Sequence, residues 1–238
     1  MSIVWFNGQF VDGTLPLDAH DRGLLLGDGV FETMAAVNHK PLWLDEHLQR
    51  MSQSAAELGI AFDAKVLFAG LGTVLRKSEA QFEALRITLS RGKTSRGLAG
   101  DSASPSLLMT LDGFDAKNLF QPCRLKVSQV RRNEFAPSSR LKTLSYIDGI
   151  AAAREVAADA DDALMLNTHG HVASSTIANI FLLRGNELIT PSLNQGILPG
   201  VMRRVLLDNA KKMGSVPVEN TVSLEDLFRA DAVFLCNS

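Results

Sequence analysis

The stretch of sequence that decides the fold is Ser139-Arg140-Leu141-Lys142-Thr143-Leu144-Ser145-Tyr146. It places one lysine between two leucines, just ahead of a segment at 147–158 whose pattern predicts a helix. Burial and neighbouring positive charge both favour the free amine of a lysine, which is its nucleophilic form. Taken alone, such a lysine is more often a solvent-exposed residue at the entrance of a helix.

Three later segments complete the pattern. They are Asn179-Ile180-Phe181, Leu198-Pro199-Gly200-Val201-Met202-Arg203 and Ala230-Asp231-Ala232-Val233-Phe234. Together with residues 139–146 they resemble the class IV aminotransferases, which are pyridoxal-phosphate enzymes of fold type IV. The resemblance covers nearly the whole chain. It implies pyridoxal 5′-phosphate as the cofactor, a small amino-acid-type substrate and a homodimer.

Composition narrows the class of protein. The chain of 238 residues is 46% hydrophobic and 21% charged, which predicts one large or two modest cores. Its 24 basic and 26 acidic residues nearly balance, so no broad cationic surface is available for nucleic acid or anionic lipid. Cys123 and Cys236 have no disulfide or zinc spacing, and the start of the chain has no signal-peptide or membrane-span pattern. We therefore expect a cytoplasmic enzyme with a small-molecule substrate.

Strand and helix patterns alternate, but several neighbouring strands look like hairpins, so we expect an α/β (α+β) fold and not a doubly wound parallel sheet. Asn7-Gly8 is typical of a tight hairpin turn. Strands are expected at 4–6, 10–11, 29–37, 84–90, 107–111, 125–130, 163–167 and 177–183. Helices are expected after an Asp45 N-cap, at 64–78, 147–158 and 201–213, and after a capping box of Ser223 and Asp226.

The segment 114–122 is the expected linker between two domains. We expect an N-terminal small α/β domain over 1–113 and a C-terminal cofactor-binding domain over 123–238. The resemblance implies that the cofactor lies at their interface. Because related chains run on past Ser238, we expect the C-terminal domain to be cut short in this sequence.

The resemblance also assigns the residues that bind the cofactor. Lys142 matches the lysine that forms a Schiff base with it and that moves the proton at the substrate Cα. The phosphate would be bound by the guanidinium of Arg50 and by the backbone N–H groups of Val201 and Met202 at a helix start. Two further matches are Leu198, packed on the pyridine ring, and Ser238, whose hydroxyl completes the phosphate site.

The substrate residues implied by the resemblance are Arg96, for a carboxylate, and Phe31, which lines the pocket. D-Amino-acid aminotransferases carry a histidine two residues after this arginine, where the present chain has Leu98. Branched-chain enzymes carry a Gly-Asn-Tyr run after the lysine, and this run is absent here. The run from Arg96 to Leu98 looks more like the 4-amino-4-deoxychorismate lyases.

The pattern breaks at Ser174. Five residues before Asn179 the family places a glutamate that keeps the pyridine nitrogen protonated, and this chain has serine there. A serine can only hydrogen-bond, which favours lyase chemistry. Our lead interpretation is a lyase that releases pyruvate and 4-aminobenzoate, on the route to folate. The alternatives are an aminotransferase for D- or branched-chain amino acids, and a protein that binds the cofactor without catalysis.

Two other motifs are set aside. Gly92-Lys93-Thr94 ends like a nucleotide-binding loop, but the position where that loop needs its first glycine is Ile87. His169 and His171 alternate in a turn without a third ligand nearby in the sequence, so no metal site is expected.

Overall fold

The structure is a computed structural model that describes residues 3–12, 14–100 and 104–238. By its internal contacts the chain divides into two compact units. The first comprises Met1–Phe120 and Lys142–Ser145, and the second comprises Gln121–Leu141 and Tyr146–Ser238. The change at residue 120 falls inside the expected linker 114–122. Lys142 had been expected in the C-terminal domain, whereas its contacts join it to the first unit.

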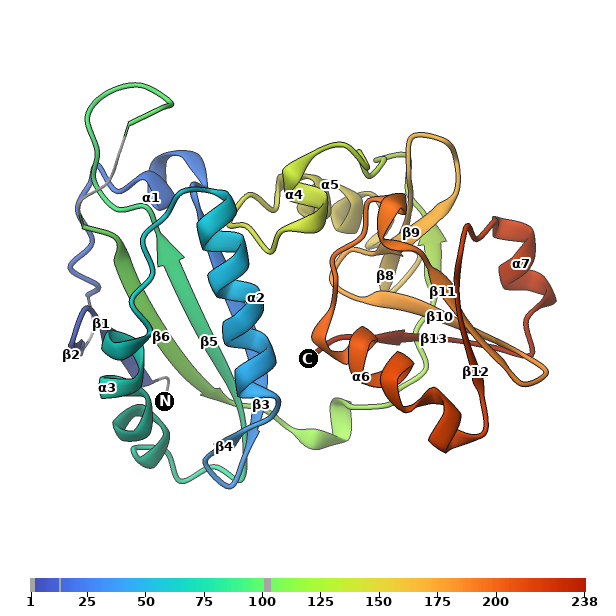
Figure 1. The fold of residues 1–238 in the computed structure, drawn as a ribbon, viewed down its shortest axis with the longest axis horizontal. Coiled ribbons are helices and arrows are strands. Elements are labelled where there is room, and N and C mark those ends of the chain that lie inside the picture. Colours follow the sequence, from blue (N-terminus) through green and yellow to red (C-terminus); the bar gives the residue numbers. More distant parts are fainter. Residues whose placement is uncertain (1–2, 13, 101–103) are drawn as a thin grey trace. The chain divides into compact units, whose positions relative to one another are not determined.

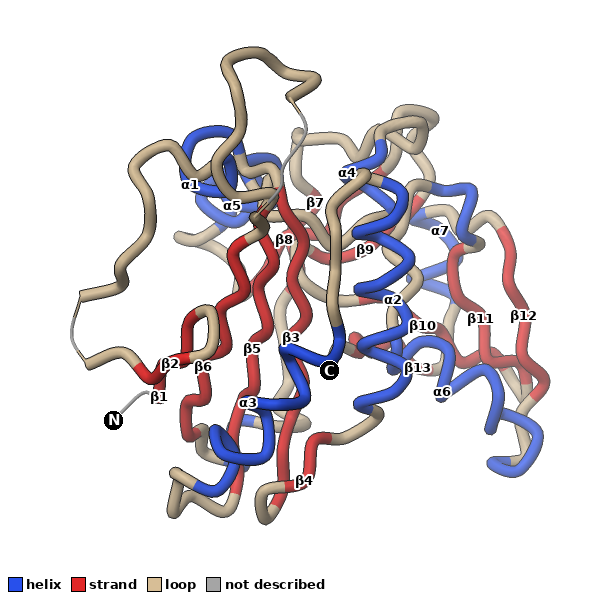
Figure 2. Tube along the Cα trace, turned by 60° about the vertical axis from the view of Figure 1, so that its left-hand side comes forward, coloured by secondary structure: helices blue, strands red, loops and turns tan. Residues whose placement is uncertain are grey.

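The first unit is built on one antiparallel sheet with the strand order β2-β1-β6-β5-β3-β4 in the described residues. Figure 2 shows β6, β5 and β3 running side by side. Asn7 and Gly8, with φ of 44° and 98°, make the tight turn between β1 and β2 that the sequence predicts. The strands are β1 (Ile3–Phe6), β2 (Gln9–Phe10), β3 (Gly29–Val37), β4 (Lys40–Pro41), β5 (Phe82–Ser90) and β6 (Ser106–Gly113).

The described residues of this unit form three α-helices: α1 (Arg22–Leu26), α2 (Leu44–Glu57) and α3 (Ala64–Arg76). Apolar side chains of α2 and α3 form one core with those of the sheet, and Met51, Leu67 and Met109 are almost fully buried there. In Figure 1 both helices lie in front of the sheet. The predicted Asp45 N-cap was wrong, because the N-cap of α2 is Trp43, two residues earlier, and Asp45 lies in the first turn. A carboxylate there still interacts favourably with the helix dipole.

The second unit holds two small sheets in its described residues, with the orders β12-β11-β10-β13 and β7-β8-β9. The pairs β7/β8 and β11/β12 are parallel, and the others are antiparallel. Figure 2 shows β11 and β12 side by side. The elements are β7 (Leu125–Val127), α4 (Pro137–Arg140), α5 (Ile147–Val156), β8 (Asp162–Leu166), β9 (Val172–Ser175), β10 (Asn179–Arg184), β11 (Glu187–Pro191), α6 (Val201–Asn209), β12 (Val216–Asn220), α7 (Leu224–Arg229) and β13 (Ala232–Cys236).

The sequence pattern missed β9, which lies between the expected strands 163–167 and 177–183 and contains Ser174. Its Ser174-Ser175 pair has low strand propensity, and antiparallel pairing with β8 overrides that preference. The expected strand 125–130 stops at Val127, since the Glu155 carboxylate then accepts from the Ser128 hydroxyl and the Gln129 N–H.

Several local predictions for the second unit were confirmed. The last helix begins with the predicted capping box of Ser223 and Asp226. The helix α6 starts at Val201 as expected and passes at Ala210 into a 3₁₀ turn. Across the described part of the chain, no helix has the length and apolar character needed to cross a membrane.

Candidate active site

The segment that contains Lys142 pairs with β3 through an isolated antiparallel bridge between Thr143 and Val30. The Phe31 N–H donates to the Lys142 carbonyl at 2.9 Å, and the Leu144 N–H donates to the Gly29 carbonyl at 2.9 Å. Gly29 permits this approach, because a Cβ there would lie 2.7 Å from the Leu144 side chain and 2.5 Å from the Leu89 carbonyl. These backbone bonds explain why residues 142–145 belong to the first unit.

Phe31 lies next to two cationic side chains. The Nζ of Lys142 is 4.5 Å from the centroid of its ring, and the Cζ of Arg86 is 3.7 Å from the same centroid. A cation over an aromatic face is attracted by the ring quadrupole. The structure therefore brings together two residues that the sequence assigned to one site, and it adds Arg86, which the sequence analysis missed.

Arg50 is fixed by a buried carboxylate on β3. Its Nε donates to Glu32 Oε1 at 2.8 Å and its Nη2 to Glu32 Oε2 at 2.6 Å, while Nδ1 of His47 lies 2.7 Å from Oε2. Burial opposes ionisation of Glu32, but the hydrogen bonds from Arg50 and His47 outweigh it and hold the pKa of this carboxyl below its usual range. The guanidinium is thus held rigidly at the α2 face of β3. A single acidic residue within an otherwise uncharged nine-residue strand was the available signal for Glu32.

Arg96 is exposed on the segment that follows β5. The structure places it in the same unit as Lys142, Phe31 and Arg50. Its guanidinium is the kind of group that binds a carboxylate with two parallel hydrogen bonds.

The first turn of α6 provides backbone donors in the second unit. The N-cap residue Gly200 offers no capping side chain, and the first N–H groups of a helix, here including those of Val201 and Met202, have no partner within the helix. The turn before the helix is held by Asn179, whose Nδ2 donates to the Leu198 carbonyl at 3.0 Å. A Cβ at Gly200 would lie 2.1 Å from Asn179 Oδ1, so only glycine fits there.

Ser174 lies on β9 and is 5% exposed. Its hydroxyl donates to the Ser175 carbonyl at 2.8 Å. A hydroxyl has one donor and two lone pairs, so the Ser174 oxygen can still accept a hydrogen bond. It does not carry the fixed negative charge that a glutamate would bring to this position.

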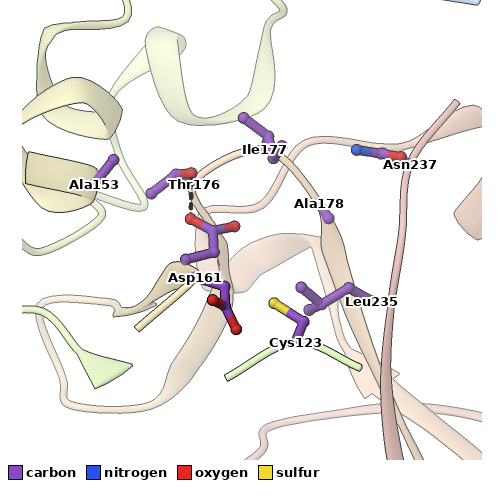
Figure 3. A pocket seen from close by; sticks show the side chains of 9 residues that line it. Cys123, Ala153, Asp161, Thr176, Ile177, Ala178, Leu235 and Asn237 are labelled. Carbon is purple, nitrogen blue, oxygen red and sulfur yellow. Dashed lines mark hydrogen bonds between the residues drawn. The ribbon is translucent and has the colours of Figure 1, made fainter. Parts of the chain in front are cut away.

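Ser238 follows β13, the strand paired with β10 so that Cys236 lies opposite Asn179. The adjoining Asn237 lines a pocket of about 350 Å³ in this unit, seen in Figure 3. There the Thr176 hydroxyl donates to the Asp162 carboxylate. None of the nine site residues predicted from the sequence lines this pocket, so it is not the predicted site.

Two donor sets therefore fit the parts of a pyridoxal-phosphate molecule. A helix start with a glycine N-cap presents backbone N–H groups that suit a phosphate. A lysine amine beside an aromatic ring is suited to the aldehyde end. The structure places Lys142, Phe31, Arg50 and Arg96 in the first unit, and Ser174, Leu198, Val201, Met202 and Ser238 in the second.

The histidine pair is occupied by other contacts. Nδ1 of His169 lies 2.5 Å from Glu134 Oε1, and the His169 and His171 rings stack with centroids 6.2 Å apart. The Thr168 hydroxyl and N–H also donate to Glu134. The pair thus braces the turn after β8.

Comparison with known proteins agrees with the fold and the motifs. Residues 29–238 match the family model described as amino-transferase class IV. The chain is 30% identical to an aminodeoxychorismate lyase of Bacillus subtilis, over 99% of this chain and 83% of that protein. It is 28% identical to a putative branched-chain-amino-acid aminotransferase of Methanocaldococcus jannaschii, over 98% and 83%.

Among solved structures, a putative 4-amino-4-deoxychorismate lyase of Legionella pneumophila is 34% identical, with a TM-score of 0.88 over 94% of this chain and 84% of that one. The matched region includes Lys142 and each later motif. The chain therefore belongs to the class IV aminotransferase family, whose members are pyridoxal-phosphate-dependent aminotransferases and lyases of fold type IV.

Proposed function

We propose that this protein uses pyridoxal phosphate on an amino-acid-type substrate, with Lys142 as the lysine bound to the cofactor. The observation that carries the proposal is the position of Lys142, whose backbone pairs with β3. Backbone hydrogen bonds to β3 at the Lys142 carbonyl and at the Leu144 N–H fix the position of its backbone, and its amine lies 4.5 Å from the Phe31 ring centroid. Because its backbone is already fixed, Lys142 loses little backbone entropy when its amine reacts with the cofactor.

Each remaining residue has a role that its chemistry supports. When bound, pyridoxal phosphate supplies a ring that withdraws electrons from the substrate Cα. Lys142 moves the proton at that carbon. The phosphate is bound by Arg50, by the N–H groups of Val201 and Met202, and by the Ser238 hydroxyl. Leu198 packs on the ring, Arg96 binds a substrate carboxylate and Phe31 lines the substrate pocket.

Reduction with borohydride tests the assignment of Lys142. The loaded protein is reduced, digested and mapped, and the pyridoxyl group should be found on the peptide that contains Lys142. Recovery of the label on Lys126 or any other lysine would refute the assignment. Lys126 is a fair comparison, because it lies on the strand β7 and is paired with Asp159.

Within the family, we propose a lyase that releases pyruvate and 4-aminobenzoate from 4-amino-4-deoxychorismate, in the cytoplasm and as a homodimer. Support comes from the lyase names of two relatives, from the run Arg96-Gly97-Leu98, and from Ser174. The second candidate is an aminotransferase, which the archaeal relative favours. Two assays separate these candidates. A lyase releases pyruvate from aminodeoxychorismate, whereas an aminotransferase changes the spectrum of the bound cofactor when D- or L-amino donors are added. A protein that binds the cofactor and gives neither signal has no catalytic role.

The proposed homodimer is tested separately, by sedimentation equilibrium of the protein loaded with the cofactor.

Ser174→Glu tests whether the residue at position 174 decides between lyase and aminotransferase chemistry. If the Ser174 position faces the pyridine nitrogen, a carboxylate there keeps that nitrogen protonated and supports reprotonation at the cofactor. The variant should therefore gain half-transamination of an amino donor relative to pyruvate release, in single-turnover spectra recorded with one donor. A parent protein that already transaminates quickly, with no gain in the variant, would contradict this role.

A further inference from the structure

Arg22 binds both ends of the segment that carries Arg96. Its backbone N–H donates to the Gly92 carbonyl at 3.0 Å. Its guanidinium donates from Nη1 to the Gly97 carbonyl at 2.6 Å and from Nη2 to the Leu98 carbonyl at 2.9 Å. The third guanidinium nitrogen, Nε, donates to Asp28 Oδ2 at 2.7 Å. One residue of α1 thus closes the segment 92–98 into a loop.

The guanidinium of Arg22 is itself held in place. Asp28 accepts from Arg91 as well as from Arg22, and Arg91 donates to the carbonyls of Leu58 and Gly59 at the end of α2. Burial opposes ionisation of Asp28, but the hydrogen bonds from Arg91 and Arg22 outweigh it and keep its pKa below the usual range. Asp28 therefore stays charged at neutral pH and orients both guanidinium groups.

The loop has little apolar packing to hold it. Leu98, its large apolar side chain, is 83% exposed, and Gly97 adopts a φ of 113° that favours glycine. The Arg22 side chain is 8% exposed, so its bonds to the two carbonyls are formed largely away from water. An arginine offers several donors in one rigid plane, and a lysine in its place cannot bind two successive carbonyls and a carboxylate with the same geometry.

We propose that Arg22 is a positioning residue that holds the 92–98 loop so that Arg96 meets the carboxylate of the substrate. The inference rests on the proposed role of Arg96 and adds the residue through which that role is maintained. The loop is fixed before the substrate arrives, which lowers the entropy cost of binding. Arg22 itself touches neither the substrate nor the cofactor in this scheme.

The test compares Arg22→Lys, Arg96→Ala and the double variant in the loaded, full-length protein. The substrate is whichever of aminodeoxychorismate and the amino donors the parent turns over fastest. Arg22→Lys should raise KM about tenfold, with kcat changed by less than about twofold, because it weakens binding and not the chemical step. In the Arg96→Ala background the same change should add almost nothing, since both changes remove one interaction.

A second readout does not depend on activity. Lys93 and Arg96 are trypsin sites within the loop, and Arg22→Lys should speed cleavage after both. Arg76→Lys, the same substitution at an exposed position on α3, should change neither cleavage nor KM. If Arg22→Lys does not fold, Arg22→Gln replaces it, because its amide retains one donor group.

Two results would overturn the inference. An unchanged KM or fully additive effects, with Arg96→Ala raising KM, would remove the role of Arg22 and leave that of Arg96 intact. An unchanged KM in Arg96→Ala would remove the proposed carboxylate role of Arg96 together with the inference.

Discussion

The two units present their candidate site residues in different ways. In the first unit, charged side chains are fixed by carboxylates: the buried Glu32 binds Arg50, and the partly buried Asp28 binds Arg22. In the second unit, the candidate groups are backbone N–H groups and uncharged side chains, positioned by the close fit of Asn179 and Gly200. Charge compensation should therefore dominate the response to substitution in the first unit, and steric fit the response in the second.

The largest effect is expected from Glu32→Gln. It keeps the volume of the side chain but leaves the Arg50 guanidinium, only 11% exposed, without its carboxylate. Removing one partner of a buried ion pair should lower the free energy of unfolding by about 3–5 kcal/mol, measured by urea denaturation. Glu79→Gln, at an exposed position between α3 and β5 in the same unit, should change it by less than about 0.5 kcal/mol. If both variants lost the same free energy of unfolding, charge compensation by Glu32 would not dominate the stability of the first unit.

Arg50→Ala should have the next largest effect, on cofactor affinity. Loss of a charged hydrogen-bond partner should cost about 1.5–3 kcal/mol, which is roughly tenfold to a hundredfold in the dissociation constant of pyridoxal phosphate. Absorbance titration of the apoprotein measures it. Arg50→Lys keeps the positive charge beside Glu32 but loses the paired N–H donors of the guanidinium. It should therefore keep the stability of the fold and lose most of the affinity for pyridoxal phosphate. Unchanged affinity in Arg50→Ala would show that the phosphate is bound elsewhere.

Gly200→Ala probes the second unit. The added methyl group would meet Asn179 Oδ1 at 2.1 Å and displace the turn that opens α6. Overpacking of this kind should cost about 1–3 kcal/mol of stability and weaken cofactor binding. Gly149→Ala on α5 is the matched control, since the nearest atoms there are 3.7 Å away. If both alanines are tolerated equally, the close fit at Gly200 does not position the helix.

The smallest effect concerns acid stability. Hydrogen bonds from its own backbone N–H, from Thr168 and from His169 outweigh burial and lower the pKa of Glu134 to about 2, from 4.5. A carboxyl with a lowered folded-state pKa stabilises the protein above 4.5, and this contribution is lost as the pH falls towards 2. Urea midpoints recorded over that pH range should fall less steeply in Glu134→Gln than in the parent. Parallel profiles would contradict the assignment.

Much of the fold could be predicted from local sequence. The strand β3 has the predicted bounds 29–37, and the Asn7-Gly8 turn and the Ser223–Asp226 capping box are where their chemistry requires them. These features depend on side-chain propensity and on hydrogen bonds within a few residues. The strand β9 could not be predicted in this way, because its serines enter a strand only through pairing with β8.

The candidate site residues also differ in how far the sequence alone could predict them. Lys142, Arg50 and the start of α6 could be predicted as site residues, because they lie in short motifs that the sequence alone displays. Arg22, Glu32 and Arg86 were missed, because contacts such as Glu32 to Arg50 and Arg22 to Leu98 join residues 18 and 76 positions apart, and Arg86 meets Lys142 only through the Phe31 ring. Spacing in the sequence gives no signal for such pairs.

By itself, the sequence determined the family, the cofactor and the lysine expected to bind it, since each is written in short contiguous motifs. Only the tertiary structure decided that residues 142–145 lie against β3 and that one arginine closes the 92–98 loop. The physical reason is that backbone donors and acceptors must be satisfied once buried, and the partners that satisfy them are set by packing and not by distance along the chain.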